Sequence, residues 1–413
     1  MASGAGWSRT QRDVVGAAFL GWTLDAFDYF LVVFVLNSLP QEFGASDREV
    51  SEALFWTLAM RPVGALLFGR LADHFGRRPA LMLSVVLYSA TELGTAGVHS
   101  LFGFLLLRAL FGVGMGGVWG VGASLAFESV PASKRGFVSG LLQAGYPTGY
   151  LLASVAYWLL IDHIGWRGMF VLGAAPALLV LFIRSRVPES SAWESTRATH
   201  GARNLWTALS GHWRLAIYAI LLMACFNFFS HGTQDLYPKF LQKQREFGKD
   251  TVSFIAIVYN IGAICGGLTF GTLSNRIGRR YAIALAAILS LLTLPFWAYA
   301  STPLLLAATS FVMQFLVQGA WGVVPAHLNE LAPAALRATF PGVVYQLGNL
   351  IASRNSVLQT AIAERHGTVL HPDYAYALTW VAGVVAILLA LMALFGPERR
   401  DIRFDDAAVR ETS

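Results

Sequence analysis

Long apolar runs make up most of this chain, and short polar segments separate them. Each run is about 20 residues long, the length that an α-helix needs to cross the hydrocarbon core of a bilayer. Because lipid offers the backbone no hydrogen-bond partners, a run of this kind predicts a transmembrane helix. Twelve runs therefore predict an all-α membrane protein with twelve transmembrane helices. They lie near residues 14–37, 51–71, 79–97, 101–128, 136–160, 168–185, 213–240, 251–274, 281–300, 303–330, 338–363 and 374–396.

One set of landmarks occurs twice in the sequence, 202 residues apart. Residues 69–78, GRLADHFGRR, reappear at 271–280 as GTLSNRIGRR. The same shift relates Trp119 to Trp321, Glu128 to Glu330, Pro131 to Pro333, Arg135 to Arg337 and Gly140 to Gly342. An internal repeat in a membrane chain is typical of transporters built from two related halves. We therefore expect two pseudo-symmetric six-helix halves at 1–185 and 213–413, joined by a polar, basic linker at 186–212 and followed by a short tail.

Composition and charge indicate a membrane location and an orientation. The mean hydropathy is +0.55, with 55% apolar and 13% charged residues, which is too apolar for an ordinary soluble domain. Of the 30 lysines and arginines, twenty fall on the side that holds both termini, seven on the opposite side and three within helices. The positive-inside rule then predicts cytoplasmic termini, in a protein of the cell (inner) membrane. The net charge of +6 reflects this topology, so we expect a lipid bilayer around the protein and no nucleic-acid partner.

The sequence gives no support to an enzyme. Residues 112–117, GVGMGG, fit the dinucleotide fingerprint, but they lie inside an apolar run and so favour close packing of helices. The chain has no HExxH or GxSxG motif and no clustered cysteine and histidine spacing. Its two cysteines, Cys225 and Cys265, lie within apolar runs. We expect no catalytic residues, no cofactor and no metal site, and no signalling domain on termini this short.

Polar side chains within the predicted helices are candidate binding residues, because hydrocarbon disfavours them. Arg61 lies midway along the second helix, and we expect it either to bind a substrate carboxylate bidentately or to pair with Asp25 or Asp28. Polar stripes on the seventh and eleventh helices predict further substrate contacts or hydrogen bonds between helices. The stripes are formed by Asn227, His231, Gln234 and Asp235, and by Gln346, Asn349 and Ser353.

Titratable residues in the same helices are candidates for proton coupling. Asp25 and Asp28 are three residues apart and share one face of the first helix. A histidine titrates near pH ~6.5 unless its surroundings perturb it, so His231 suits proton exchange. Arg108 fits either proton coupling or a structural ion pair with a neighbouring carboxylate. Asp25 also fits a carboxylate that is permanently paired. For Glu92 we expect a structural role. The candidates for proton coupling are Asp25, Asp28, His231, Asp235 and Arg108.

Charged residues near the helix ends predict a gate on the cytoplasmic side. Asp73 and the arginines that follow it are expected to face Glu128, and the second half has Asn275 where the first has Asp73. Ion pairs of this kind would hold the side closed, more strongly in the first half, although exposed pairs contribute only about 0–1 kcal/mol each. The predicted gate residues are Asp73, Arg77, Arg78, Glu128, Arg135, Arg279, Arg280, Glu330 and Arg337.

These residues resemble the motifs of the major facilitator superfamily. Residues 69–78 are similar to its G-x-x-x-D-x-x-G-R-R loop, and Arg108 with Gly112 and Gly116 resembles its fourth-helix pattern. Pro188-Glu189-Ser190 with Trp193 resembles the segment that follows the sixth helix in sugar porters and their relatives. The resemblance covers essentially the whole chain. It implies that the first helices of the two halves line a central site and that the halves rock about it.

A narrower resemblance concerns the substrate. Residues 227–235, NFFSHGTQD, are similar to a segment of the sialate:H⁺ symporter family, closest to its lactate/pyruvate–proton permeases, and 345–349, YQLGN, resemble the same group. In that family a threonine usually stands four residues after the aspartate that corresponds to Asp235, whereas this chain has Lys239 there. Residues 25–28, DAFD, are instead similar to a segment of aromatic-acid:H⁺ symporters. The resemblance implies proton-coupled transport of a small organic anion, most simply a monocarboxylate such as lactate or pyruvate. Sialic acid and aromatic acids are the alternatives, and we expect the protein to act as a monomer.

Overall fold

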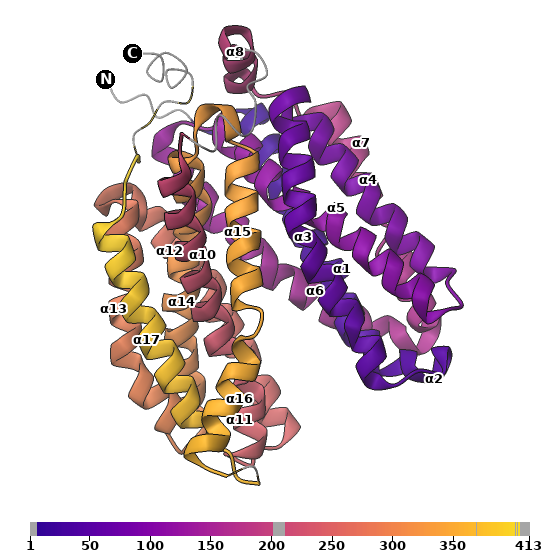
Figure 1. The fold of residues 1–413 in the computed structure, drawn as a ribbon, viewed down its shortest axis with the longest axis vertical. Coiled ribbons are helices and arrows are strands. Elements are labelled where there is room, and N and C mark those ends of the chain that lie inside the picture. Colours follow the sequence, from indigo (N-terminus) through magenta and orange to yellow (C-terminus); the bar gives the residue numbers. More distant parts are fainter. Residues whose placement is uncertain (1–5, 201–210, 369, 401, 403, 405–413) are drawn as a thin grey trace.

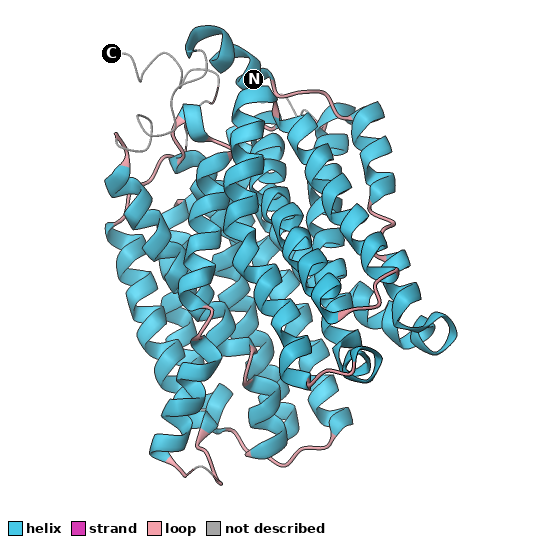
Figure 2. Ribbon diagram, turned by 45° about the vertical axis from the view of Figure 1, so that its right-hand side comes forward, coloured by secondary structure: helices cyan, strands magenta, loops and turns pink. Residues whose placement is uncertain are grey.

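The computed structural model describes residues 6–200, 211–368, 370–400, 402 and 404. Within these residues every regular element is a helix, and no strand occurs (Figure 2). Residues 201–210 of the predicted linker and the end of the predicted tail lie outside the described residues.

Among the described residues, the first half of the chain contains five long helices and several short ones. Their bounds are α1 Arg9–Val35, η1 Leu36–Ser38, α2 Leu39–Phe43, α3 Asp47–Phe75, α4 Arg77–Ala96, α5 Leu101–Ser129, α6 Ala132–Leu172, α7 Ala177–Arg186 and α8 Ser191–His200. The second half contains α10 Trp213–Gln234, α11 Tyr237–Lys243, α12 Lys249–Ile277, α13 Arg279–Tyr299, α14 Pro303–Leu331, η2 Ala334–Leu336, α15 Thr339–Ala352, α16 Asn355–His366 and α17 Tyr374–Phe395.

All twelve predicted spans are helical, but not all of them are continuous. Among the described residues, seven helices are individually long and apolar enough to cross a membrane, and α6 with α7, bent by 40°, forms a further candidate. The predicted sixth span runs from the end of α6 into α7 across a break at 173–176. The predicted eleventh span is divided into α15 and α16, and the seventh continues from α10 into α11. Hydrophobicity predicts the length of a span but carries no signal for such breaks.

The repeated GRR segment makes the same turn in both halves. Gly76 separates α3 from α4 with φ 115°, and Gly278 separates α12 from α13 with φ 102°. A side chain at either position would be strained in this conformation, so glycine is required there. The sequence repeat therefore reflects two equivalent helix–turn–helix corners.

The helices form two bundles that meet toward one end of the molecule. In Figure 1 the indigo to magenta helices α1–α7 lie together, and the orange and yellow helices α12–α17 lie together with α10. We call the end that carries α8 the terminal face. Here the bundles converge, and toward α2, α11 and α16 they lie farther apart. Between the bundles, α6 packs against α12 and α14, and α15 packs against α3 and α5. The helices approach closely, because a Cβ atom on Gly140 would lie 2.3 Å from the carbonyl oxygen of Gly267.

Candidate functional site

Arg61 is buried between the two bundles with unused hydrogen-bond donors. Arg61 is 3% exposed, and within the described part of the chain its Nε and Nη2 atoms have no hydrogen-bond partner. The guanidinium carbon lies 6.0 Å from the ring of Trp22 in α1 and 5.9 Å from the ring of Tyr345 in α15. An arginine from one bundle thus faces an aromatic ring from the other. Its free donors match the fork that binds a carboxylate.

Aromatic side chains from both bundles surround this arginine. The ring of Tyr345 lies 4.7 Å from that of Trp119 and 5.6 Å from that of Trp321, two residues that the repeat relates. On the other side, Trp22 stacks on Tyr146 with ring centroids 5.6 Å apart. These rings form flat apolar walls beside a cationic group, an arrangement that suits an organic anion.

Sequence reasoning missed the aromatic contribution of α1. Tyr29 interacts electrostatically with Arg61, Asp235 and Tyr345, so it faces both bundles. Trp22, Asp25 and Tyr29 have the spacing i, i+3, i+7, which places them on one face of α1. That spacing was the available signal, but aromatic residues are so common in apolar helices that it did not distinguish them.

The two aspartates of α1 are fully buried. Asp25 and Asp28 are both 0% exposed, and none of their four carboxylate oxygens has a partner among the described residues. Asp25 interacts electrostatically with Arg61, but the two form no ion pair within 4.0 Å. The alternative of a direct structural pair between them is therefore absent from this conformation. An ionised carboxylate buried without a partner is strongly disfavoured, which makes both groups natural positions for a proton.

Glu92 and Arg108 form a buried ion pair beside Asp28. Arg108 Nη1 lies 2.8 Å from Glu92 Oε1, and Nη2 donates to Thr95 Oγ1 at 2.9 Å. The second oxygen of Glu92 has no partner within the described part of the chain, and it points with Asp28 Oδ1 toward Gly173 at the break between α6 and α7. A Cβ atom on Gly173 would lie 3.1 Å from Asp28 Oδ1 and 3.2 Å from Glu92 Oε2. Arg108 is thus tied to α4, while Asp28 remains unpaired next to it.

The second bundle contributes a histidine–aspartate pair. His231 Nδ1 lies 3.1 Å from Asp235 Oδ1, and Ser356 donates to Asp235 Oδ2 at 3.1 Å. The two side chains are 39% and 37% exposed, so this pair is far more accessible than the acids of α1. His231 also hydrogen-bonds Asn349 and interacts electrostatically with Arg61. The structure therefore brings together the residues predicted on the seventh and eleventh helices and the predicted carboxylate anchor.

The predicted amide ligands divide into two groups. Asn227 donates to the Met223 carbonyl of its own helix at 2.8 Å, and Gln234 donates to Gln314 Oε1 at 2.7 Å. These two amides are already bound to the protein in this conformation. Gln346 is 1% exposed, and both polar atoms of its amide lack a partner among the described residues. Of the buried predicted amides, Gln346 keeps its full capacity to bind a ligand.

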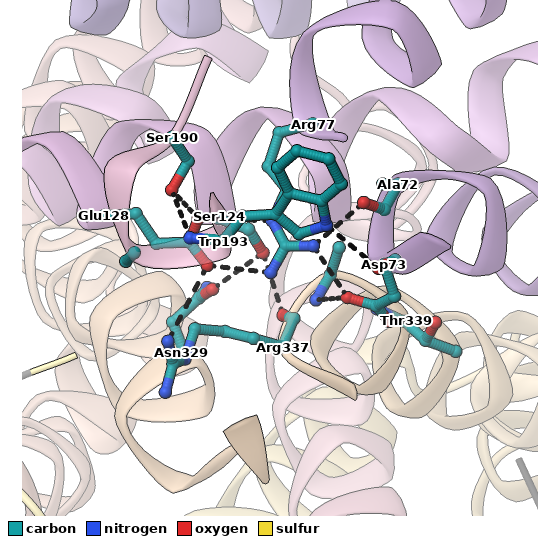
Figure 3. A network of polar contacts seen from close by, with 12 residues as sticks. Ala72, Asp73, Arg77, Ser124, Glu128, Ser190, Trp193, Asn329, Arg337 and Thr339 are labelled. Carbon is teal, nitrogen blue, oxygen red and sulfur yellow. Dashed lines mark hydrogen bonds and ion pairs between the residues drawn. The ribbon is translucent and has the colours of Figure 1, made fainter. Parts of the chain in front are cut away.

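At the terminal face, an ion-pair network joins the two bundles (Figure 3). Arg77 lies 3.0 Å from Asp73 Oδ1 and binds Glu128 through Nη2 at 2.9 Å and Nε at 3.2 Å. Asp73 accepts hydrogen bonds from the backbone N–H of Ala338 at 3.0 Å and of Thr339 at 3.1 Å. The network therefore begins within the first bundle and ends on the first turn of α15.

The second half repeats this network with one charge fewer. Arg279 lies 2.8 Å from Glu330 and donates to Asn275 Oδ1 at 2.9 Å. Asn275 Oδ1 accepts from the backbone N–H of Gly136 at 3.0 Å, and Gly136 is 202 residues before Ala338. The two cross-bundle contacts are thus related by the same shift as the sequence motifs.

Two further ion pairs connect the halves reciprocally. Arg337 Nη1 lies 3.9 Å from Glu128 Oε1, and Arg135 Nη1 lies 3.8 Å from Glu330 Oε1. Each arginine reaches the carboxylate of the other half. Ser124 adds a neutral contact, because its hydroxyl lies 2.8 Å from the Arg337 carbonyl oxygen. Of the residues predicted as a gate, all except Arg78 and Arg280 therefore meet where the bundles converge at the terminal face.

Arg78 and Arg280 do not take part in this network, in contrast to the expectation that Arg78 faces Glu128. Arg78 Nη2 donates to the Arg184 carbonyl at the end of α7, and Arg280 donates to the Leu394 carbonyl at the end of α17. Adjacent residues of a helix point in directions about 100° apart. When the first arginine of the motif points inward, the second must therefore point toward the neighbouring helix end.

Comparison with known proteins identifies the class. A sequence model of the Major Facilitator Superfamily matches residues 18–353 and 236–411, and the chain belongs to this family. It is 29% identical to a carboxylic acid transporter protein homolog of Saccharomyces cerevisiae, over 92% of this chain and 67% of that one. It is also 29% identical to the sialic acid transporter NanX of Escherichia coli, over 86% of this chain and 88% of that one.

A solved structure shares the fold. The proton:xylose symporter XylE superimposes with a TM-score of 0.74 at 20% identity, covering 97% of this chain and 99% of that one. The predicted fold class is therefore confirmed, and so is the prediction of a membrane transporter instead of an enzyme. The subfamily, the boundaries of the halves and the roles of the site residues stay predictions.

Proposed function

We propose that this protein is a proton-coupled secondary transporter of a small organic anion that works by alternating access. The observation that carries the proposal is Arg61, a buried arginine between the bundles whose Nε and Nη2 have no partner, and which forms no ion pair, among the described residues. An unpaired guanidinium in such a place is costly unless a carboxylate binds it during the working cycle. The relatives named above transport carboxylic acids by their names, which agrees with an anionic ligand.

The first candidate substrate is a monocarboxylate such as lactate or pyruvate. The carboxylate would bind Arg61, and Gln346 and Asn349 would orient the remaining polar group. This assignment follows the resemblance of residues 227–235 and 345–349 to lactate/pyruvate–proton permeases. Sialic acid is the larger alternative within the same group.

An aromatic acid is the second candidate, and the ring walls favour it. Trp22 and Tyr345 flank the guanidinium of Arg61 at 6.0 and 5.9 Å, and Tyr146 extends the wall on the α1 side. A planar ring fits between such walls better than a short hydroxy acid does. The DAFD segment of α1, which resembles aromatic-acid symporters, lies on the same helix as Trp22.

Proton coupling follows from the charges around the anchor. Moving one negative charge against a negative-inside potential costs about 2.3 kcal/mol per 100 mV, whereas an anion that travels with one proton crosses neutrally. Asp25 and Asp28 are buried acids without hydrogen-bond partners among the residues that the structure describes, and the pair of His231 and Asp235 is more accessible. We assign the proton to the aspartates while the anion binds, with the histidine pair as a relay toward the opposite face.

The closed terminal face corresponds to one state of the cycle. Asp73 with Thr339 and Arg337 with Glu128 connect the bundles there, and α1 is not among the helices that pack closely against α10. The positive-inside distribution assigns this face to the cytoplasm, so the conformation described is the one closed to the inside. Opening would break these contacts as the halves 1–185 and 213–413 rock about Arg61.

Uptake into proteoliposomes tests the function. The purified full-length chain would be reconstituted, with valinomycin and potassium to clamp the membrane potential, and given labelled lactate, sialic acid or benzoate. We expect one of these acids to accumulate when the outside is acidic and to stop accumulating when a protonophore collapses the gradient. Accumulation driven by sodium and indifferent to the pH gradient would contradict the proposal, as would transport of neutral sugars alone.

A further inference from the structure

A groove lies outside the transport pathway, where α4 and α7 meet near the terminal face. Its volume is about 530 Å³. Met82, Leu83 and Val86 of α4 and Val180 of α7 form an apolar wall, and Arg78 and Arg184 stand at its terminal end. Leu83 and Val86 are 52% and 45% exposed, so this wall belongs to the outer surface of the bundle. The groove therefore combines a surface for hydrocarbon with two cationic side chains.

Both arginines retain unused donors. Arg78 donates through Nη2 to the carbonyl of Arg184, and its buried Nε has no partner among the described residues. The side chain of Arg184 is exposed and forms no hydrogen bond or ion pair with any described residue; only its carbonyl is used. Two arginines that form no ion pair with any described residue thus line the same apolar groove.

The acid that also lines the groove does not neutralise them. Glu189 accepts hydrogen bonds from the backbone N–H groups of Arg77 at 2.9 Å, of Arg78 at 3.2 Å and of Ser190 at 2.9 Å. Its carboxylate therefore caps the start of α4, and it forms no ion pair with Arg78 or Arg184. The two arginines outnumber the single glutamate, so the groove presents a net positive charge to a ligand.

The second half of the chain shows that Arg184 is not needed for the helix contact. Glu398 caps α13 there by accepting from Arg279 N at 2.6 Å, and Arg280 donates to the Leu394 carbonyl. When Pro188-Glu189 is aligned with Pro397-Glu398, Arg184 and Arg186 correspond to Ala393 and Phe395. A similar arginine-to-carbonyl contact, displaced by one residue, therefore forms there without cations at these positions. The guanidinium group of Arg184 is therefore available for a ligand.

We propose that this groove binds an anionic phospholipid, with its phosphate between Arg78 and Arg184 and one acyl chain along the wall of α4 and α7. Guanidinium groups bind phosphate oxygens through paired hydrogen bonds. The apolar wall selects a lipid over a free phosphate ion, and basic grooves between helices on the cytoplasmic side suit anionic headgroups. A bound lipid would brace the start of α4, one residue from the Arg77 network that closes the terminal face.

The test measures lipid binding by the full-length protein in detergent. Fluorescent phosphatidylglycerol would be titrated against the wild type, and phosphatidylcholine of the same chain length would serve as the neutral probe. We expect phosphatidylglycerol to bind at least about tenfold more tightly, and millimolar inorganic phosphate to leave it bound. Arg184→Gln keeps the carbonyl that Arg78 uses, so the fold is retained, and we expect it to remove most of that preference.

Arg280→Gln is the matched control, because Arg280 makes the same kind of carbonyl contact where the corresponding arginines are missing. We expect this variant to bind phosphatidylglycerol like the wild type. Equal affinity of the wild type for the two lipids would overturn the proposal, and so would unchanged preference in Arg184→Gln. Displacement of the lipid by free phosphate would reassign the site to an inorganic anion. None of these readouts depends on transport, so the outcome is independent of the proposed substrate.

Discussion

Asp73, near the end of α3, accepts hydrogen bonds from Thr339, the first residue of α15, through the backbone N–H at 3.1 Å and the hydroxyl at 2.6 Å. A carboxylate of one bundle therefore caps a helix of the other, where the helix dipole favours negative charge. In the second half, the neutral Asn275 makes the corresponding contact with Gly136. The terminal face thus has two related contacts between the bundles, which we call latches. Only the latch formed by Asp73 places a charged side chain at a helix N-terminus.

We predict that Asp73→Asn weakens this latch without unfolding the protein. Asparagine still offers an acceptor, as Asn275 does, but loses its charge interactions with Arg77 and the α15 dipole. From the sequence these ion pairs are expected to be exposed, but the side chain of Asp73 is only 5% exposed. Its contacts therefore contribute more free energy than exposed pairs would. A loss of about 1 kcal/mol would shift the population about fivefold toward the state open at the terminal face.

Labelling of single cysteines from each side of the membrane measures this shift. Asp162→Asn is the control, because it removes an exposed acid that lies outside the latch. Unchanged labelling in Asp73→Asn together with normal turnover would reduce Asp73 to a structural cap.

For Arg61→Lys, we predict a loss of transport of about tenfold or more with normal membrane abundance. An ammonium keeps the charge but cannot reproduce the planar fork toward a carboxylate. The measurement is the concentration dependence of uptake, with Arg214→Lys, an exposed arginine at the start of α10, as the control. Wild-type kinetics in the Arg61 variant would remove this residue from the substrate site.

Asp28→Asn should uncouple transport from the proton. The amide resembles the protonated acid and avoids burying a charge, so we expect the variant to fold and to exchange labelled for unlabelled substrate. We expect no accumulation against a gradient, because the position can no longer release a proton. Exchange and pH-driven accumulation are measured in the same vesicles. Retained accumulation would show that another residue carries the coupling proton. Asp25→Asn, measured in the same way, would then show whether Asp25 carries it.

Glu92→Gln should affect stability more than mechanism. It leaves the buried Arg108 without its ion pair, and removing one partner of a buried pair costs about 3–5 kcal/mol. We expect a lower melting temperature and a lower yield in the membrane. The double change of Glu92→Gln with Arg108→Gln should recover much of the loss, because no unpaired charge remains. Equal stability of the single and double variants would show that the pair is not a structural tie.

The sequence predicted the helices well because two strong signals coincide. Apolar length defined the spans, and the GRR repeat predicted the corners that Gly76 and Gly278 make. The breaks at 173–176 and between α15 and α16 were missed, since helix breaks inside an apolar run depend on packing against neighbouring helices. The family confirms the class, whereas the orientation in the membrane and the boundaries of the halves rest on charge and repeat patterns.

The candidate site was predicted less completely, because a sequence shows which residues are polar but not which are already satisfied. Gln234 and Gln346 look equivalent as amides in apolar helices, yet Gln234 is bound to Gln314 and Gln346 has no partner among the described residues. Tyr29 and Tyr146 were missed because an aromatic residue in such a helix is usually only packing. Arg78 was misplaced because its neighbour Arg77 uses the inward direction.

The most direct test of the central claim follows protons and substrate together. Vesicles that contain the protein and a trapped pH-sensitive dye would receive labelled substrate at equal pH on both sides, with the membrane potential clamped at zero. We predict acidification of the interior that rises in step with uptake of the anion, in the ratio of one proton to each monoanion, and that is lost in Asp28→Asn. Uptake of the anion at the same rate with no change of internal pH would contradict the account.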